Sequence, residues 1–248
     1  MPGGAPARHG PRRLVASALA AAGSFFLEPA VPRTDPPSQL QSGLRVVVAV
    51  FGLARGCGVT VVSRALAAEL ARRDAGGAAA VHCEVRAAGI PLATQAAARL
   101  ARTLADVPGA STRAVGRLCL VAGAERSALA DTARYFAPLV LDAGSTSLGG
   151  APAALADRVV IVATPPTEPA LASVAAECLA RLGHESIVVL NRTAAGDTDG
   201  PPPSWDGRAA LGLPESRVGA QLALGGREAR GELGRAIEEL ADLCEAAA

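Results

Sequence analysis

The sequence contains no lysine, because all 24 basic residues are arginine. This absence excludes a lysine Schiff base, a lysine general base and a lysine that holds a phosphate group. Aromatic residues are also scarce, and the rings present are Phe25, Phe26, Phe51, Tyr135, Phe136 and Trp205. With a net charge of +1 and scattered arginines, binding of nucleic acid is not supported. The core must therefore consist mainly of Ala, Val and Leu.

Paired cysteines and clustered histidines are absent as well. The five cysteines are Cys57, Cys83, Cys119, Cys178 and Cys244, and none belongs to a C-x-x-C pair. An odd, scattered set favours buried reduced thiols over disulfides and indicates a cytoplasmic protein. The three histidines also lack the spacing of metal ligands.

An apolar run at residues 14–27 follows three arginines, and a stretch containing four prolines follows it. The run is too short to cross a bilayer as a helix, and no clear small-x-small cleavage site comes after it. We expect residues 1–43 to be an apolar segment and linker that docks on a protein partner or a membrane surface. Residues 44–248 are expected to form one domain.

From residue 45 onward, apolar β-branched stretches alternate with helical stretches. Strands are expected at 45–51, 79–85, 118–122, 137–142, 158–163 and 186–191, and helices at 59–73, 91–104, 125–134, 168–182 and 228–244. This alternation predicts an α/β fold with a mostly parallel sheet and helices on both faces. The polar, proline-rich stretch at 193–206 predicts a mobile loop.

The turn between the first strand and the first long helix carries the main functional signal. Ligands of open parallel sheets bind where the strands end, and glycine-rich turns present amides to phosphate groups. Gly56 and Gly58 lie in such a turn. The expected nucleotide-binding residues are Arg55, Gly56, Cys57, Gly58, Val59, Thr60 and Val61.

Residues 54–60, ARGCGVT, resemble the loop K-G-G-x-G-K-[ST] of the ParA/MinD family of deviant-Walker P-loop ATPases. Residues 139–144 (LVLDAG), 156–163 with the following prolines, 188–192 (VVLNR) and 213–218 resemble later segments of that family. The resemblance implies bound ATP and Mg²⁺, with Thr60 and Asp142 at the metal and Asn191 and Arg192 at the purine. It also implies a homodimer that acts by localisation.

The chain departs from the family pattern at both lysine positions, which are Ala54 and Val59. Glu84 and Arg86 stand where the family often carries D-x-D. Phosphoryl transfer depends on positioning and charge neutralisation, and one cationic residue can contribute about 10³ to 10⁵ in rate. We therefore expect a localisation, regulatory or scaffold role with weak or no ATP hydrolysis, and Arg55 is the candidate replacement cation.

Two alternatives remain open. Gly52, Gly56 and Gly58 also fit the G-x-x-x-G-x-G fingerprint of short-chain dehydrogenases, with Glu84 placed to bind a ribose. The missing Tyr-x-x-x-Lys pair excludes an active dehydrogenase but leaves a Rossmann-like dinucleotide-binding pseudo-enzyme. The second alternative is a purely structural interaction protein, which a loop filled by Arg55 or Val59 would favour.

Overall fold

The structure is a computed structural model that describes residues 46–81, 92–123, 138–145, 151–194, 204–205 and 208–246. The segment at 1–43, the helix expected at 125–134 and most of the loop expected at 193–206 lie outside these residues. Glu84 and Arg86, which bear on the family comparison, lie outside them too.

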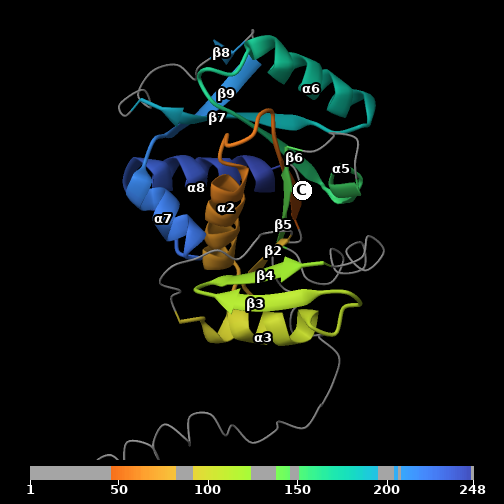
Figure 1. Cartoon of the computed structure of the whole chain (residues 1–248), viewed down its shortest axis with the longest axis vertical. Coiled ribbons are helices and arrows are strands. Elements are labelled where there is room, and N and C mark those ends of the chain that lie inside the picture. Colours follow the sequence, from red (N-terminus) through yellow and green to blue (C-terminus); the bar gives the residue numbers. More distant parts are fainter. Residues whose placement is uncertain are drawn as a thin grey trace, which may run out of the picture. The chain divides into compact units, whose positions relative to one another are not determined.

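The described strands form one sheet in the order β3-β4-β2-β5-β1-β6-β7-β9-β8 (Figure 1). They are β1 (Val47–Gly52), β2 (Ala78–Val81), β3 (Ser111–Val115), β4 (Leu118–Ala122), β5 (Leu139–Gly144), β6 (Arg158–Ala163), β7 (Ser186–Thr193), β8 (Ser204–Trp205) and β9 (Arg208–Pro214). In this spatial order, all neighbouring strands between β4 and β9 pair in parallel. The two edge strands are antiparallel to their neighbours: β3 pairs with β4, and β8 pairs with β9. The prediction of a mostly parallel α/β sheet is confirmed.

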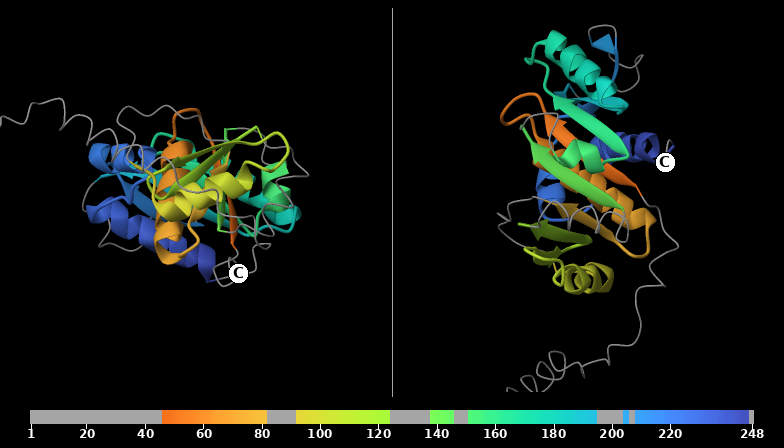
Figure 2. Two further views of the ribbon diagram at one scale, coloured as in Figure 1. Left: turned by 90° about the horizontal axis from the view of Figure 1, so that it is seen from below. Right: turned by 90° about the vertical axis from the view of Figure 1, so that its right-hand side faces the viewer.

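Helices cover both faces of this sheet. They are α2 (Val59–Arg73), α3 (Gln95–Leu104), α5 (Ala151–Leu155), α6 (Pro169–Arg181), α7 (Arg217–Leu224) and α8 (Gly231–Glu245). One core cluster joins α2, α7 and α8 to the sheet, and a second cluster joins α3, α5 and α6 to the other face. Figure 2 shows α3 and α6 near opposite ends of the sheet.

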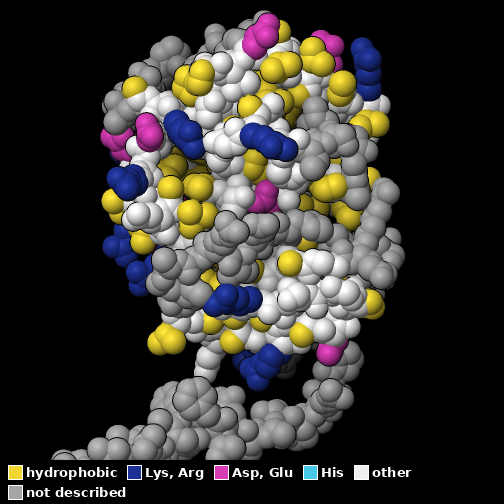
Figure 3. Space-filling model, in the orientation of Figure 1, with side chains coloured by type: hydrophobic (Ala, Val, Ile, Leu, Met, Phe, Trp, Pro, Cys, Tyr) yellow, Lys and Arg dark blue, Asp and Glu magenta, His cyan; other side chains and the backbone are white. Residues whose placement is uncertain are grey.

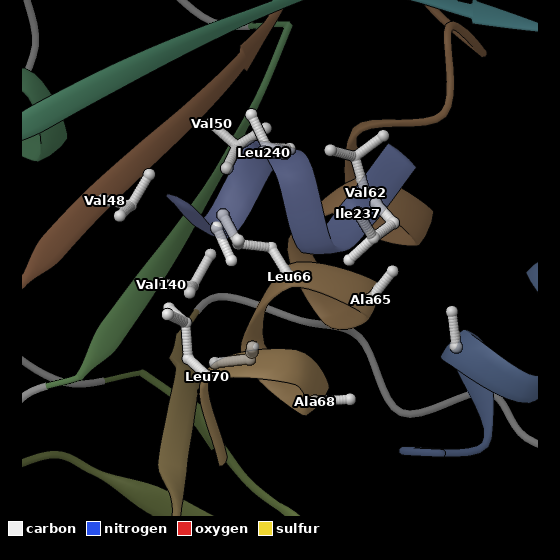
Figure 4. Packing of buried hydrophobic residues seen from close by; sticks show 14 of the residues in the cluster. Val48, Val50, Val62, Ala65, Leu66, Ala68, Leu70, Val140, Ile237 and Leu240 are labelled. Atoms are coloured by element: carbon white, nitrogen blue, oxygen red, sulfur yellow. The ribbon is translucent and has the colours of Figure 1, made fainter. Parts of the chain in front are cut away.

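Alternating side chains of β1 supply both cores. Val48 and Val50 face α2 and α8, whereas Val47 and Ala49 belong to the cluster on the other face. Such a strand is buried on both sides, which explains its unbroken apolar sequence. Figure 4 shows Val48, Val50 and Val140 of the sheet directed toward the side chains of α2 and α8.

Helix α2 begins and ends where the sequence predicted. Val62, Leu66 and Leu70 recur at helical spacing and are fully buried or nearly so. Gly58 precedes the helix in the left-handed conformation, and Arg72 and Arg73 occupy its last turn. The helix therefore lies with its amino-terminal end at the carboxyl ends of the strands, which places the glycine turn at the expected edge.

Several boundaries and elements differ from expectation. Strand β1 ends one residue later than expected, at Gly52, and β5 ends two residues later, at Gly144. Strand β7 extends to Thr193, so the loop that was expected to begin at this residue begins after it. The sequence pattern does not predict β3, β8, β9, α5 or α7, and β8 lies within the stretch that was expected to be a loop. Strand β3 has alternating exposed residues and no strong apolar run, because it lies at an edge and buries little of its surface.

The cysteine prediction is partly corrected. Cys57, Cys119 and Cys244 are buried, but Cys178 on α6 is exposed. Burial raises the pKa of both Cys119 and Cys244 to about 12, so these two thiols stay protonated and unreactive near neutral pH.

Within the described part of the chain, no helix is both long enough and apolar enough to cross a bilayer. The apolar run at 14–27 lies outside the described residues.

Candidate functional site

The glycine turn leaves the sheet from its central strand. Strand β1 lies between β5 and β6, and the Leu53 amide donates to the Val162 carbonyl of β6 over 3.0 Å. The chain then passes through residues 54–58 to the start of α2. Ligand sites of open α/β sheets form at such an edge, because several strands end there together.

Two glycines give the turn its shape. Gly56 has φ 77° and Gly58 has φ 97°, values that favour glycine strongly over any residue with a Cβ atom. A Cβ atom on Gly58 would also clash with the side-chain amide of Asn191. The backbone therefore bends closely enough at this point that no larger residue fits without displacement of its neighbour.

The amino-terminal end of α2 presents unused donors. Its first internal hydrogen bond runs from the Val62 amide to the Gly58 carbonyl over 3.0 Å. No described side chain caps the preceding amides, and the first turn carries no acidic residue. The amides of Val59, Thr60 and Val61 are thus available to an anion, which the positive end of the helix dipole would also favour.

Two residues at the end of β7 donate hydrogen bonds to backbone carbonyls of the glycine turn. Asn191 is buried, and its Nδ2 atom donates to the Cys57 carbonyl over 2.8 Å. The Arg192 guanidinium donates to the Gly56 carbonyl over 3.0 Å, and Arg192 has the unusual φ of 66°. A non-glycine residue held in this region is strained and indicates that its surroundings enforce the conformation. The structure thus brings Asn191 and Arg192 to the turn.

The two lysine positions of the family loop differ in their surroundings. Val59 is buried in the core and lies with Cys57 against the space next to Gly52, where an added Cβ atom would meet the two side chains at 2.5 and 2.6 Å. Ala54 is exposed, as is Arg55. Arg55 therefore does not fill the turn, and Val59 packs into the core beneath it. The sequence places Gly52 only in a dehydrogenase fingerprint and gives no sign of this packing role.

Asp142 and Thr60 are the two oxygen donors expected at a metal ion. Asp142 lies on β5 beside Val50 of β1, just before the pairing of these strands shifts register. Its Oδ1 atom accepts a hydrogen bond from the Gly144 amide over 3.2 Å, and the residue is 8% exposed. Thr60 is the second residue of α2 and is half-buried. Carboxylate and hydroxyl oxygens suit Mg²⁺, so this donor set fits the metal that the family resemblance implies.

The strand order argues against the Rossmann-like alternative. In a Rossmann fold the first two strands of the sequence are neighbours, so an acid at the end of the second strand reaches the ribose. Here β5 lies between β1 and β2. The glycine turn therefore does not have the neighbour that the dinucleotide fingerprint requires, so the topology contradicts the alternative of a Rossmann-like pseudo-enzyme.

The arginines do not gather on the face shown in Figure 3. Most of the described arginine side chains lie singly over that face, and a few lie near one another at its left-hand edge. A nucleic-acid surface normally shows a basic patch or stripe. The visible face offers no such feature.

Neither family models nor curated protein sequences give a match to this chain. Solved structures do match. The septum site-determining protein MinD from Pyrococcus horikoshii OT3, in complex with Mg-ADP, superposes with a TM-score of 0.56 at 15% identity, covering 80% of this chain and 95% of that one.

Two further structures agree. A variant of McdA from Cyanothece, in complex with ATP, has a TM-score of 0.55 at 14% identity and covers 82% of this chain and 96% of its own. A ParA family ATPase from Chlorobium tepidum TLS has a TM-score of 0.52 at 16% identity, with coverages of 79% and 98%. From strand order, helix placement and these superpositions together, the chain has the P-loop fold of the ParA/MinD ATPases.

Proposed function

We propose that this protein is a ParA/MinD-type nucleotide-binding protein that acts by localisation, regulation or scaffolding, with weak or no ATP hydrolysis. The observation that carries the proposal is the uncapped amino-terminal end of α2, which lies at the carboxyl edge of a parallel sheet. Thr60 and Asp142 are at the same edge. Structures with this fold were solved with Mg-ADP and with ATP.

Each residue of the site has a separate proposed role. The backbone amides of Gly56, Gly58, Val59, Thr60 and Val61 bind the phosphates, whereas the Cys57 amide donates to the Ala54 carbonyl over 3.4 Å. The Thr60 hydroxyl and the Asp142 carboxylate hold Mg²⁺ beside the phosphates. Asn191 and Arg192 fix the turn from its carbonyl side and form the wall next to which a purine would lie. Mg²⁺, when bound, would neutralise phosphate charge.

The lost ammonium groups set the expected rate. Transition-state charge in phosphoryl transfer is neutralised by cations, and one such cation contributes about 10³ to 10⁵ in rate. Ala54 and Val59 supply none, and Val59 is buried in the core. Backbone donors alone can still bind a nucleotide, whereas efficient hydrolysis also requires cations that neutralise the charge of the transition state.

The test is a titration of fluorescent ATP and GTP in the presence of Mg²⁺, combined with a turnover assay. We expect weak binding that saturates below millimolar nucleotide, with turnover close to the background rate. Absence of binding at millimolar nucleotide would contradict the nucleotide-binding role and leave the purely structural interaction protein. Turnover that falls sharply in Arg55→Ala would instead show residual catalysis by Arg55.

A homodimer and a protein partner or membrane surface contacted through residues 1–43 are the further parts of this proposal. Family members act by localisation, and the apolar run at 14–27 would supply a docking segment. Sedimentation of the full chain with and without nucleotide tests the dimer. Flotation with anionic vesicles, compared between the full chain and a chain that begins at residue 44, tests the membrane contact.

A further inference from the structure

We propose that this site favours a nucleoside diphosphate over the corresponding triphosphate. The inference rests on the proposed nucleotide-binding function and specifies the ligand of that same site. It follows from an imbalance within the turn: the donors nearest the helix are present, whereas the cations that hold the outermost phosphate are missing.

The inner half of the site is intact. In P-loops, backbone amides surround the α- and β-phosphates, while the lysine reaches the β- and γ-phosphates. Here the amides of Val59, Thr60 and Val61 have no cap from any described side chain, and Gly56 and Gly58 keep the positive φ values that the turn needs. The place of a Gly58 Cβ atom is closed by Asn191, so the turn cannot widen on that side.

Among the residues that the structure describes, the outer half has no positioned cation. Val59 carries an isopropyl group that is 7% exposed and packed against the core, and Ala54 carries a methyl group. The Arg192 guanidinium is engaged with the Gly56 carbonyl over 3.0 Å. Arg55 is exposed, and we find no hydrogen bond or ion pair that fixes it within the described residues.

A third phosphate would therefore add negative charge without meeting a positioned cation among the described residues. A diphosphate would use the uncapped amides of Val59, Thr60 and Val61 and carry less uncompensated charge. A charge-assisted hydrogen bond is about twice as strong as a neutral one, so the missing lysine removes the main source of triphosphate preference.

The test measures dissociation constants of ADP and ATP by calorimetry on the full chain, each with Mg²⁺ at one ionic strength. We expect ADP to bind more tightly than ATP, by up to about tenfold. Equal affinities, or tighter binding of ATP, would overturn the inference while leaving the proposed function intact. Binding of neither nucleotide would overturn the proposed function and this inference with it.

Lysine substitutions test the cause. Ala54→Lys places an ammonium group at an exposed position, with Ala54→Gln as its uncharged control, so folding should be preserved. Val59→Lys, with Val59→Met as control, places one at the start of α2, where burial puts folding at risk. In variants that keep the wild-type circular dichroism, we expect at least one lysine to shift the affinity ratio toward ATP by about tenfold. Ratios equal to those of the controls in all folded lysine variants would overturn the inference.

Discussion

The two ends of helix α2 differ in their polar contacts: the carboxyl-terminal end carries ion pairs, whereas the amino-terminal end is uncapped. At the carboxyl-terminal end, Glu69 accepts hydrogen bonds from Arg72 and Arg73, and Arg73 also contacts Asp242 and Glu245 of α8 at 2.6 and 3.0 Å. At the amino-terminal end, no described side chain caps the helix. The charged groups at the carboxyl-terminal end are thus paired within the protein, while the backbone amides at the amino-terminal end have no partner among the described side chains.

Under the proposed function, this difference gives the carboxyl-terminal end of α2 a structural role and its amino-terminal end a binding role. Burial alone would raise the pKa of Glu69, but hydrogen bonds from Arg72 and Arg73 lower it overall. Burial opposes the charge of Arg73 as well, yet its carboxylate partners raise its pKa. These mutual shifts mean that the ionised network stabilises the contact between α2 and α8. Substitutions at this end should therefore change stability, and substitutions at the other end should change binding.

The largest expected effect is at the ion-paired end. Arg73→Met keeps the aliphatic length but leaves three carboxylates without their shared partner, so we expect the free energy of unfolding to fall by about 3 kcal/mol. Urea denaturation measures this change. The matched control is Arg117→Met, because Arg117 pairs with Glu228 at the surface and should contribute less than about 1 kcal/mol. Equal effects of the two variants would show that the ion pairs of Arg73 contribute no more than a surface pair.

Gly58→Ala addresses the binding end. The new Cβ atom would meet a positive φ and the Asn191 amide together, so we expect a stability loss of about 1–3 kcal/mol and loss of measurable nucleotide binding. Gly183→Ala has a similar φ of 84° but open space around the Cβ position, so it isolates backbone strain. Calorimetric binding that survives in Gly58→Ala would remove the turn from the site.

Thr60→Val removes one hydroxyl and keeps the shape of the side chain. We expect Mg²⁺-dependent nucleotide affinity to fall about tenfold, equivalent to about 1.4 kcal/mol, with little change in stability. Thr103→Val on α3 is the control, since its hydroxyl donates only to the Arg99 carbonyl of its own helix. An unchanged magnesium dependence in Thr60→Val would show that the threonine does not contact the metal.

The smallest effect is an acid dependence confined to the ion-paired end. Because the pKa of Glu69 is lowered in the folded protein, its contribution is present above the unfolded pKa of about 4.3 and is lost as pH falls through the folded value. The stability difference between wild type and Glu69→Gln should therefore shrink on acidification. A difference that stays constant between pH 7 and pH 3 would contradict this assignment.

The sequence predicted the centre of the molecule better than its margins. The apolar runs of β1, β4 and β6 and the spacing of Val62, Leu66 and Leu70 report directly on burial, so these elements lie where expected. Strand β3 buries little, and α5 is a single short turn of helix, so neither leaves a strong pattern. The local pattern of apolar residues does not reveal elements whose structure depends on contacts with other parts of the fold.

The candidate site shows the same division. Gly56 and Gly58 were expected in a glycine-rich turn, which their positive φ values fit, and the metal roles of Thr60 and Asp142 were expected from the family resemblance alone. The hydrogen bonds of Asn191 and Arg192 to the turn could not be deduced, because they join residues far apart in the chain. The burial of Val59 was likewise invisible, since valine at the first position of a helix packs inward or outward depending on the strand beside it.

The position of β5 between β1 and β2 has a consequence for how the molecule is made. The strand that supports the glycine turn obtains both of its neighbours, β5 and β6, from much later parts of the chain. A fragment that ends before residue 139 would contain the complete turn and α2 yet lack the partners that hold them in place. During synthesis the turn can therefore acquire its final geometry only after the middle of the chain has left the ribosome, and such long-range pairing slows folding.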